Sequence, residues 1–194
     1  MHRKLLAVCA VIAIVVGGGL AYYDNHPYCG ITEEDSAAMG DLIRRLEHER
    51  EERELKLQRE NANLIALTER IVKYCQLPTA EARELAEEIL AAALRFDLSP
   101  SLLCGIMIVE SHGQRKAKNK HCVGLMQVNS RVWHKALREA GINDVGGIES
   151  GAYILSIYLR QTNGNLRLAL ARYSGGARGY ADKVYRAAEK EFAW

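Results

Sequence analysis

The residue best suited to acid–base chemistry is Glu110, which follows a run of apolar residues. Ser99 and Pro100 are typical of a helix start, and Gly113 is typical of a helix end, so the sequence predicts a helix over 100–111. This helix is apolar on all sides, which indicates a buried position. Lost solvation and the negative end of the helix dipole both raise the pKa of a carboxyl group there. Glu110 is therefore a candidate general acid, and the alternative is an exposed residue that merely follows a core helix.

Short motifs follow Glu110 in a fixed order. Glu110-Ser111 precedes Gly-Leu-Met-Gln at 124–127, which begins fourteen residues after the glutamate, and Ala-x-Tyr-x-x-Gly follows at 171–176. Each motif alone is common, but the joint pattern is specific. The set resembles the soluble-type lytic transglycosylase (SLT) domain, a lysozyme-like domain that cleaves peptidoglycan. The resemblance covers about residues 78–190.

The resemblance implies a role for several residues. Glu110 matches the single catalytic acid/base, Ser111 matches a group that hydrogen-bonds near the reacting sugar, and Tyr173 matches a tyrosine that orients the glutamate. The further residues expected to line the glycan cleft are Met126, Gln127, Asn129 and Tyr180. Met126 and Tyr173 fit a helical core equally well, whereas the Gln127 amide has less reason to lie in an apolar loop.

The chain departs from the family pattern at three places. Gln114 and Arg115 stand where the family usually has Asn-Pro, Ser174 stands where it usually has Asn, and Gly175 replaces a more usual Ala. A serine hydroxyl still donates and accepts hydrogen bonds. We therefore expect Ser174 to change the position of the substrate and not to abolish the chemistry.

Most glycosidases need two carboxyl groups, and here Glu110 stands out alone. The other acidic residues of this part of the chain lie in polar settings typical of solvated surface charges: Glu139, Asp144, Glu149 and Asp182. The lytic transglycosylase scheme needs no second carboxylate, and it leaves a 1,6-anhydromuramoyl end. Two alternatives stay open, a lysozyme-type hydrolase and a non-catalytic peptidoglycan-binding assembly factor of a secretion, conjugation or phage machine.

The elements that must position these residues are helices. The sequence after residue 78 predicts helices at 80–96, 100–111, 131–140, 148–161, 166–173 and 180–192, with no run of strand alternation. The fold class is therefore all-α, with a lysozyme-like domain at 78–194. His112, His121 and Cys122 lack the spacing of a metal site, and we expect neither a metal nor another cofactor.

The segment before this domain, at 31–77, is expected to be a long charged helical spacer. Residues 31–73 carry 11 acidic and 8 basic side chains, contain no Pro and have a single Gly at position 40. Apolar positions recur near both ends but are missing from 47–54, whereas a coiled coil needs an unbroken apolar seam. A spacer that self-associates weakly is favoured over a strict coiled coil.

Residues 1–30 are typical of an export signal. A basic head precedes an uncharged run at 5–23, whose length fits either an uncleaved anchor or a cleaved signal peptide. We expect the rest of the chain to lie in the bacterial cell envelope, on the periplasmic side, either anchored in the inner membrane or secreted after cleavage. In that oxidising compartment Cys104 and Cys122 form either a disulfide or two buried thiols.

The charge distribution limits the partners. Residues 101–194 carry 14 basic and 7 acidic side chains, although the whole chain has a net charge of only +2. Such a surface suits an anionic polymer, but the basic residues are scattered and aromatic residues are too few for a nucleic-acid stacking platform. The charge pattern therefore does not favour nucleic acid. The resemblance implies peptidoglycan glycan strands as partners, the uncharged run at 5–23 adds the membrane, and an envelope-spanning machine is a further expected partner.

Overall fold

The computed structural model describes residues 33–188, and it describes side chains from residue 37 onward. The predicted apolar segment at 5–23 lies outside the described residues. Within the described part of the chain, no helix has both the length and the apolar character needed to cross a membrane. The chain divides into two compact units, Met1–Glu54 and Leu55–Trp194, and all the site residues predicted above lie in the second.

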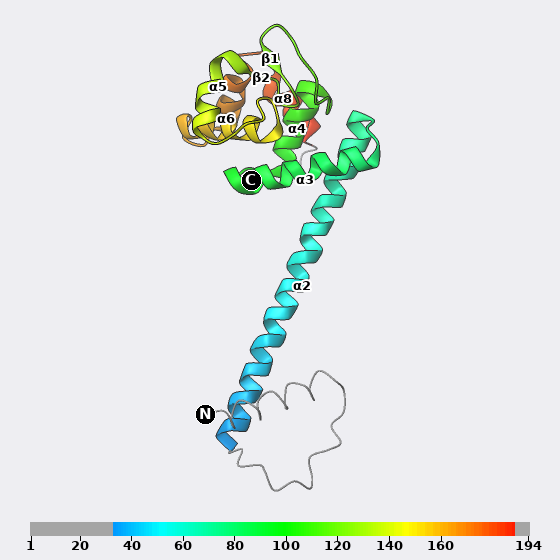
Figure 1. Ribbon diagram of the computed structural model, residues 1–194, viewed down its shortest axis with the longest axis vertical. Coiled ribbons are helices and arrows are strands. Elements are labelled where there is room, and N and C mark those ends of the chain that lie inside the picture. The colour runs from blue at the N-terminus through cyan, green and yellow to red at the C-terminus, as the bar shows by residue number, and fades with distance from the viewer. Residues whose placement is uncertain (1–32, 189–194) are drawn as a thin grey trace. The chain divides into compact units, whose positions relative to one another are not determined.

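Helix α2 runs without a break from Glu33 to Cys75 (Figure 1). Its middle is covered by charged side chains that pair one turn apart, such as Arg50 with Glu54 and Lys56 with Glu60. These pairs support an exposed helix by a few tenths of a kcal/mol each, at about 0.2–0.5 kcal/mol. The helix predicted over 31–73 is confirmed, while its roles as a spacer and in self-association stay predictions.

The second unit is built mainly from helices that follow α2 (Figure 1). They are α3 (Thr79–Phe96), α4 (Pro100–Ser111), α5 (Ser130–Glu139), α6 (Ile148–Gln161), α7 (Leu166–Tyr173) and α8 (Tyr180–Ala187). The mainly helical fold is confirmed. The described part of α8 ends at Ala187, while the predicted helix extends to 192, beyond the described residues.

A small hairpin interrupts the helices. Strands β1 (Cys122–Val123) and β2 (Val128–Asn129) pair antiparallel, with Cys122 opposite Asn129. No strand is predicted from the sequence, because a strand of two residues is too short to show an alternating pattern. The turn of this hairpin is the Gly-Leu-Met-Gln motif at 124–127.

Helix α4 is the centre of the core. It packs against α3, α6 and α8, and residues 102–108 are all buried. At Gly105 the backbone of α8 comes so close that an added Cβ would lie 2.9 Å from the Val184 carbonyl oxygen. The buried helix predicted from its uniform apolar character is therefore confirmed, and its last turn presents Glu110 at the edge of the core.

The last turns of α2 also belong to this core. Ile71 is fully buried and Leu67 is 5% exposed, and both join the same apolar cluster as α3 and α4. The domain boundary expected at 77/78 stays a prediction. The apolar contacts of the second unit nevertheless begin before it, in α2.

Candidate active site

Glu110 is held by a tyrosine from the last described helix. It is half-buried near the C-terminal end of α4, and its Oε1 atom accepts a hydrogen bond of 2.5 Å from the hydroxyl group of Tyr180, which begins α8. Burial raises the pKa of Glu110 above its usual value, and the Tyr180 hydrogen bond offsets part of this rise. Burial and the nearby Glu110 charge hold the pKa of Tyr180 far above its usual value, so Tyr180 remains a donor.

Tyr173 contacts the Tyr180 ring and the hairpin turn. Its ring stacks on the ring of Tyr180, with centroids 6.5 Å apart and planes at 20°. Its hydroxyl group donates to the backbone carbonyl of Met126 at 2.9 Å. The resemblance implied that Tyr173 orients the glutamate, but in the structure the direct hydrogen bond to Glu110 comes from Tyr180. Tyr173 links α7 to the hairpin turn.

Met126 fills the space beneath the hairpin turn. Its side chain is fully buried, and its backbone N–H donates to the carbonyl of Gly146 at 2.9 Å. It packs onto α6 at Gly151, where an added Cβ would lie 2.6 Å from the Met126 Cβ. Met126 therefore acts here as a core residue that fixes the turn, which was the alternative to a cleft-lining role.

The Gln127 amide is fully engaged inside the chain. Its Nε2 atom donates to the carbonyls of Gly124 at 2.9 Å and Ala117 at 3.2 Å, and its Oε1 accepts from Asn119 at 3.0 Å. These bonds tie the loop after α4 to the hairpin turn. The sequence predicted hydrogen-bond partners for this amide. In the structure those partners are the backbone carbonyls and the Asn119 side chain of the chain itself.

Ser111 also points inward. Its side chain is buried, and its hydroxyl lies 2.8 Å from the carbonyl of Leu125 and 3.2 Å from that of Met107. A hydroxyl group has one proton, so it donates to one of these carbonyls at a time, and Leu125 is the closer. Ser111 thereby holds the hairpin turn against the end of α4, next to Glu110.

Asn129 follows the hairpin turn on β2. Its Oδ1 atom is buried and accepts no hydrogen bond from any group in the described part of the chain. A buried acceptor without a donor costs about 1–3 kcal/mol. Asn129 Oδ1 is therefore a buried acceptor whose hydrogen-bonding capacity the described residues leave unused.

Cys122 is a site residue that sequence reasoning did not place. Its thiol is half-buried on β1, and burial together with the Glu110 charge raises its pKa. The disulfide considered from the sequence is not formed, and Cys122 carries a free thiol. Cys104 is enclosed in the core on α4, whereas Cys122 lies half-buried on β1.

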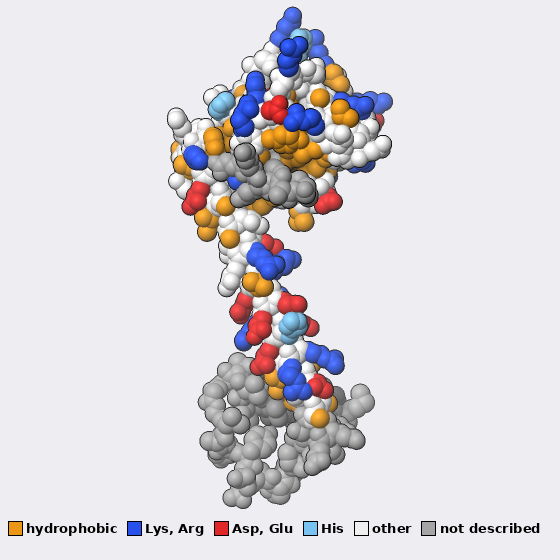
Figure 2. Space-filling model, turned by 180° about the vertical axis from the view of Figure 1, so that it is seen from behind, with side chains coloured by type: hydrophobic (Ala, Val, Ile, Leu, Met, Phe, Trp, Pro, Cys, Tyr) orange, Lys and Arg blue, Asp and Glu red, His pale blue; other side chains and the backbone are white. Residues whose placement is uncertain are grey.

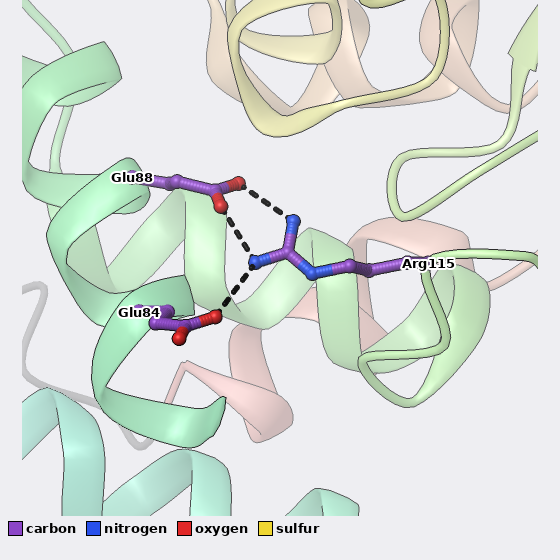
Figure 3. Close-up of polar contacts among 3 residues, drawn as sticks. All are labelled: Glu84, Glu88 and Arg115. Atoms are coloured by element: carbon purple, nitrogen blue, oxygen red, sulfur yellow. Dashed lines mark hydrogen bonds and ion pairs between the residues drawn. The ribbon is translucent and has the colours of Figure 1, made fainter. Parts of the chain in front are cut away.

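Arg115 replaces the proline that the family usually has after Glu-Ser. Figure 3 shows its guanidinium group directed at two carboxylates of α3. It bonds both oxygens of Glu88, at 2.6 and 3.2 Å, and approaches Glu84 at 3.9 Å. A bidentate ion pair thus fastens the loop that a proline would otherwise stiffen.

Of the other four candidate carboxylates, Asp144 is exposed and makes no ion pair within residues 37–188, and the remaining three lie near basic side chains. Glu149 pairs with Arg95, Asp182 pairs with Arg167 at 2.7 Å, and Glu139 lies 3.9 Å from Lys135. Their side chains are 39%, 48% and 66% exposed, which agrees with surface charges. The site therefore holds one carboxyl group of raised pKa, one tyrosine hydroxyl and one buried amide oxygen without a donor among the described residues.

Comparison with known proteins gives a family. A family model described as "Transglycosylase SLT domain" matches residues 87–193, which include every residue of the site described above. Searches of curated proteins and of solved structures returned no match. Because the family match spans more than half of the chain, this chain belongs to the SLT transglycosylase family, whose lysozyme-like domains act on peptidoglycan.

Proposed function

We propose that this protein is a peptidoglycan lytic transglycosylase with Glu110 as its single general acid and base. The observation that carries this proposal is the half-buried Glu110 carboxyl group at the end of α4, fixed by Tyr180 at 2.5 Å. Burial keeps the carboxyl protonated to a higher pH than an exposed glutamate. The group is therefore able to donate a proton at a pH at which an exposed glutamate has already lost its own.

The proposed reaction needs no water. Glu110 gives its proton to the glycosidic oxygen between N-acetylmuramic acid and N-acetylglucosamine, and the C1–O bond breaks. The substrate's own N-acetyl group stabilises the cation at C1. The Glu110 carboxylate then takes the proton of the 6-hydroxyl, whose oxygen attacks C1. Glu110 ends protonated, and the product carries a 1,6-anhydromuramoyl end.

Tyr180 and Asn129 have separate tasks in this proposal. The Tyr180 hydrogen bond directs one carboxyl oxygen of Glu110 and leaves the other for the sugar bridge. The buried Oδ1 atom of Asn129 accepts a hydroxyl or amide proton of the glycan. Four further residues position the hairpin and Tyr180 and do not contact the substrate in this proposal. They are Ser111, Met126, Gln127 and Tyr173.

The test is digestion of insoluble peptidoglycan by the full chain, with mass spectrometry of the released fragments. We expect anhydro ends from the unmodified protein and a loss of about 10²–10⁴-fold in Glu110→Gln. Glu139→Gln removes an exposed carboxylate and is the matched control, which should cleave normally. Fragments heavier by one water would identify a lysozyme-type hydrolase. Sedimentation with peptidoglycan without any release would identify a binding protein.

We also propose that the protein works in the bacterial cell envelope. The support is the basic head and the uncharged run at 5–23, together with the peptidoglycan substrate of the family. An uncleaved run would attach the chain to the inner membrane, with the SLT domain on the periplasmic side and within reach of an envelope-spanning machine. Fractionation of cells, with N-terminal sequencing of the protein, tests both the location and the cleavage.

A further inference from the structure

A pocket of about 300 Å³ lies beside the hairpin and is lined by residues other than Glu110. The loop 115–118 forms one wall, the turn 144–147 before α6 forms the other, and residues 123–125 lie between them. Neither Glu110 nor a tyrosine of the site lines it. The two places are nevertheless joined, because Leu125 lines the pocket while its carbonyl receives the hydroxyl of Ser111.

The wall formed by residues 115–118 carries positive charge that can bind a ligand. Lys116 and Lys118 are exposed at the pocket and make no ion pair with any group in the described part of the chain. Arg115 also lines the pocket, but Glu88 and Glu84 already compensate its charge (Figure 3). Lys and Arg side chains project from the face of the second unit drawn in Figure 2. The two lysines therefore offer positive charge with no internal partner.

The opposite wall carries Asp144, whose side chain is exposed and makes no ion pair within residues 37–188. Apolar groups lie between the charges, from Val123, Leu125 and Val145. A molecule that fits this pattern has carboxylates for the lysines, an ammonium group for the aspartate and small apolar groups between them. Such a molecule is a short peptide, whereas a glycan strand stripped of its peptides carries lactyl carboxylates but no ammonium group for the aspartate.

We infer that this pocket binds the acidic peptide stem that peptidoglycan carries on its glycan strand. The inference rests on the proposed function, because it takes peptidoglycan as the substrate. The volume lies at the lower end of ligand pockets, which run to about 300–1,000 Å³, and suits the end of a peptide. Binding there places part of the substrate against residues 123–125 of the hairpin, where the Leu125 carbonyl receives the Ser111 hydroxyl.

The first experiment compares two substrates with the full chain. One is glycan strands that keep their peptides, and the other is strands stripped of peptides by an amidase. The double variant Lys116→Gln/Lys118→Gln should raise KM about threefold to tenfold on peptide-bearing strands. It should leave kcat on those strands unchanged, and it should leave KM on the stripped strands unchanged. Lys120→Gln is the matched control, since Lys120 is an exposed lysine of the same loop that does not line the pocket. Equal shifts on both substrates, or no shift, overturn the inference.

The second experiment separates this inference from the proposed function. Calorimetry measures binding of the stem tripeptide of alanine, glutamate and diaminopimelate to full-length Glu110→Gln, so no cleavage is required. We expect binding that weakens with the two lysine changes and with Asp144→Asn. Absence of binding overturns the inference even if Glu110 proves catalytic. Equal binding of inorganic phosphate also overturns it, because the pocket would then be a general anion site.

Discussion

The hydrogen bond between Tyr180 and Glu110 opposes the effect of burial on the same carboxyl group. Burial raises the pKa of Glu110, and the tyrosine hydroxyl stabilises the carboxylate and lowers it. In Tyr180→Phe the lowering is lost while the aromatic ring remains, so the pKa of Glu110 rises further. Because a general acid works only while protonated, the alkaline limb of the kcat/KM profile should move to higher pH. Rates measured across a pH series check this.

Tyr173→Phe is the control for that experiment. The Tyr173 hydroxyl donates to the Met126 carbonyl and makes no hydrogen bond to Glu110, so its loss should leave the alkaline limb in place. It should instead lower the free energy of unfolding by about 1 kcal/mol. A shift of the limb in Tyr173→Phe without one in Tyr180→Phe would reverse the two roles.

Glu110 also makes stability depend on pH. Its folded pKa is raised above the unfolded value, so the folded state holds its proton more tightly. Stability is then unaffected below the usual carboxyl pKa and declines as the pH rises through the folded pKa. Glu110→Gln removes this penalty, so it should melt at a higher temperature than the unmodified chain at pH 8 and at the same temperature at pH 3. Thermal denaturation at both pH values tests the sign.

At the scale of elements, the loop after α4 is fastened twice, by Gln127 from the hairpin and by Arg115 to α3. The ion pair is partly exposed, so its coupling energy with Glu88 should be modest, about 0.5–1 kcal/mol. Single and double changes of Arg115 and Glu88 to Gln measure it in a double-mutant cycle. Either single change should also speed tryptic cleavage in the lysine-rich segment 116–120. Unchanged cleavage would mean that Gln127 alone holds the loop.

Most helix positions were predictable, because apolar periodicity and end residues are local signals. The ranges 100–111, 148–161 and 166–173 agree with the structure. The hairpin was not predictable, because its strands of two residues exist only through tertiary support. Met126 rests on Gly151, and Gly146 accepts its N–H, and neither contact is visible in the spacing of residues 122–129.

Within the candidate site, the position of Glu110 at the end of a buried helix was predictable, because it depends on the local character of that helix. Its partner was not assigned, since Tyr180 lies 70 residues away and Tyr173 matched the family motif better. The sequence also did not show that the side chains of Ser111 and Gln127 point into the domain. A polar residue in an apolar setting signals that a partner exists, but it does not say whether that partner is backbone or substrate.

At the scale of the whole molecule, the second unit begins inside α2 and includes its buried end. A fragment of residues 55–194 should therefore fold with the thermal stability of the full chain. A fragment of residues 78–194 loses Leu67 and Ile71, each worth about 1.5–3 kcal/mol of burial. Chemical denaturation of the two fragments tests this. Equal stability would place the folding boundary near residue 78.

The last described helix, α8, supplies the tyrosine that hydrogen-bonds to Glu110. Tyr180 begins α8, so the chain must extend 70 residues past Glu110 before the hydroxyl can reach the carboxyl group. A chain truncated before Tyr180 carries Glu110 without the hydrogen bond that directs its carboxyl group. The direction and the pKa of the Glu110 carboxyl group are therefore set only once α8 has joined the fold.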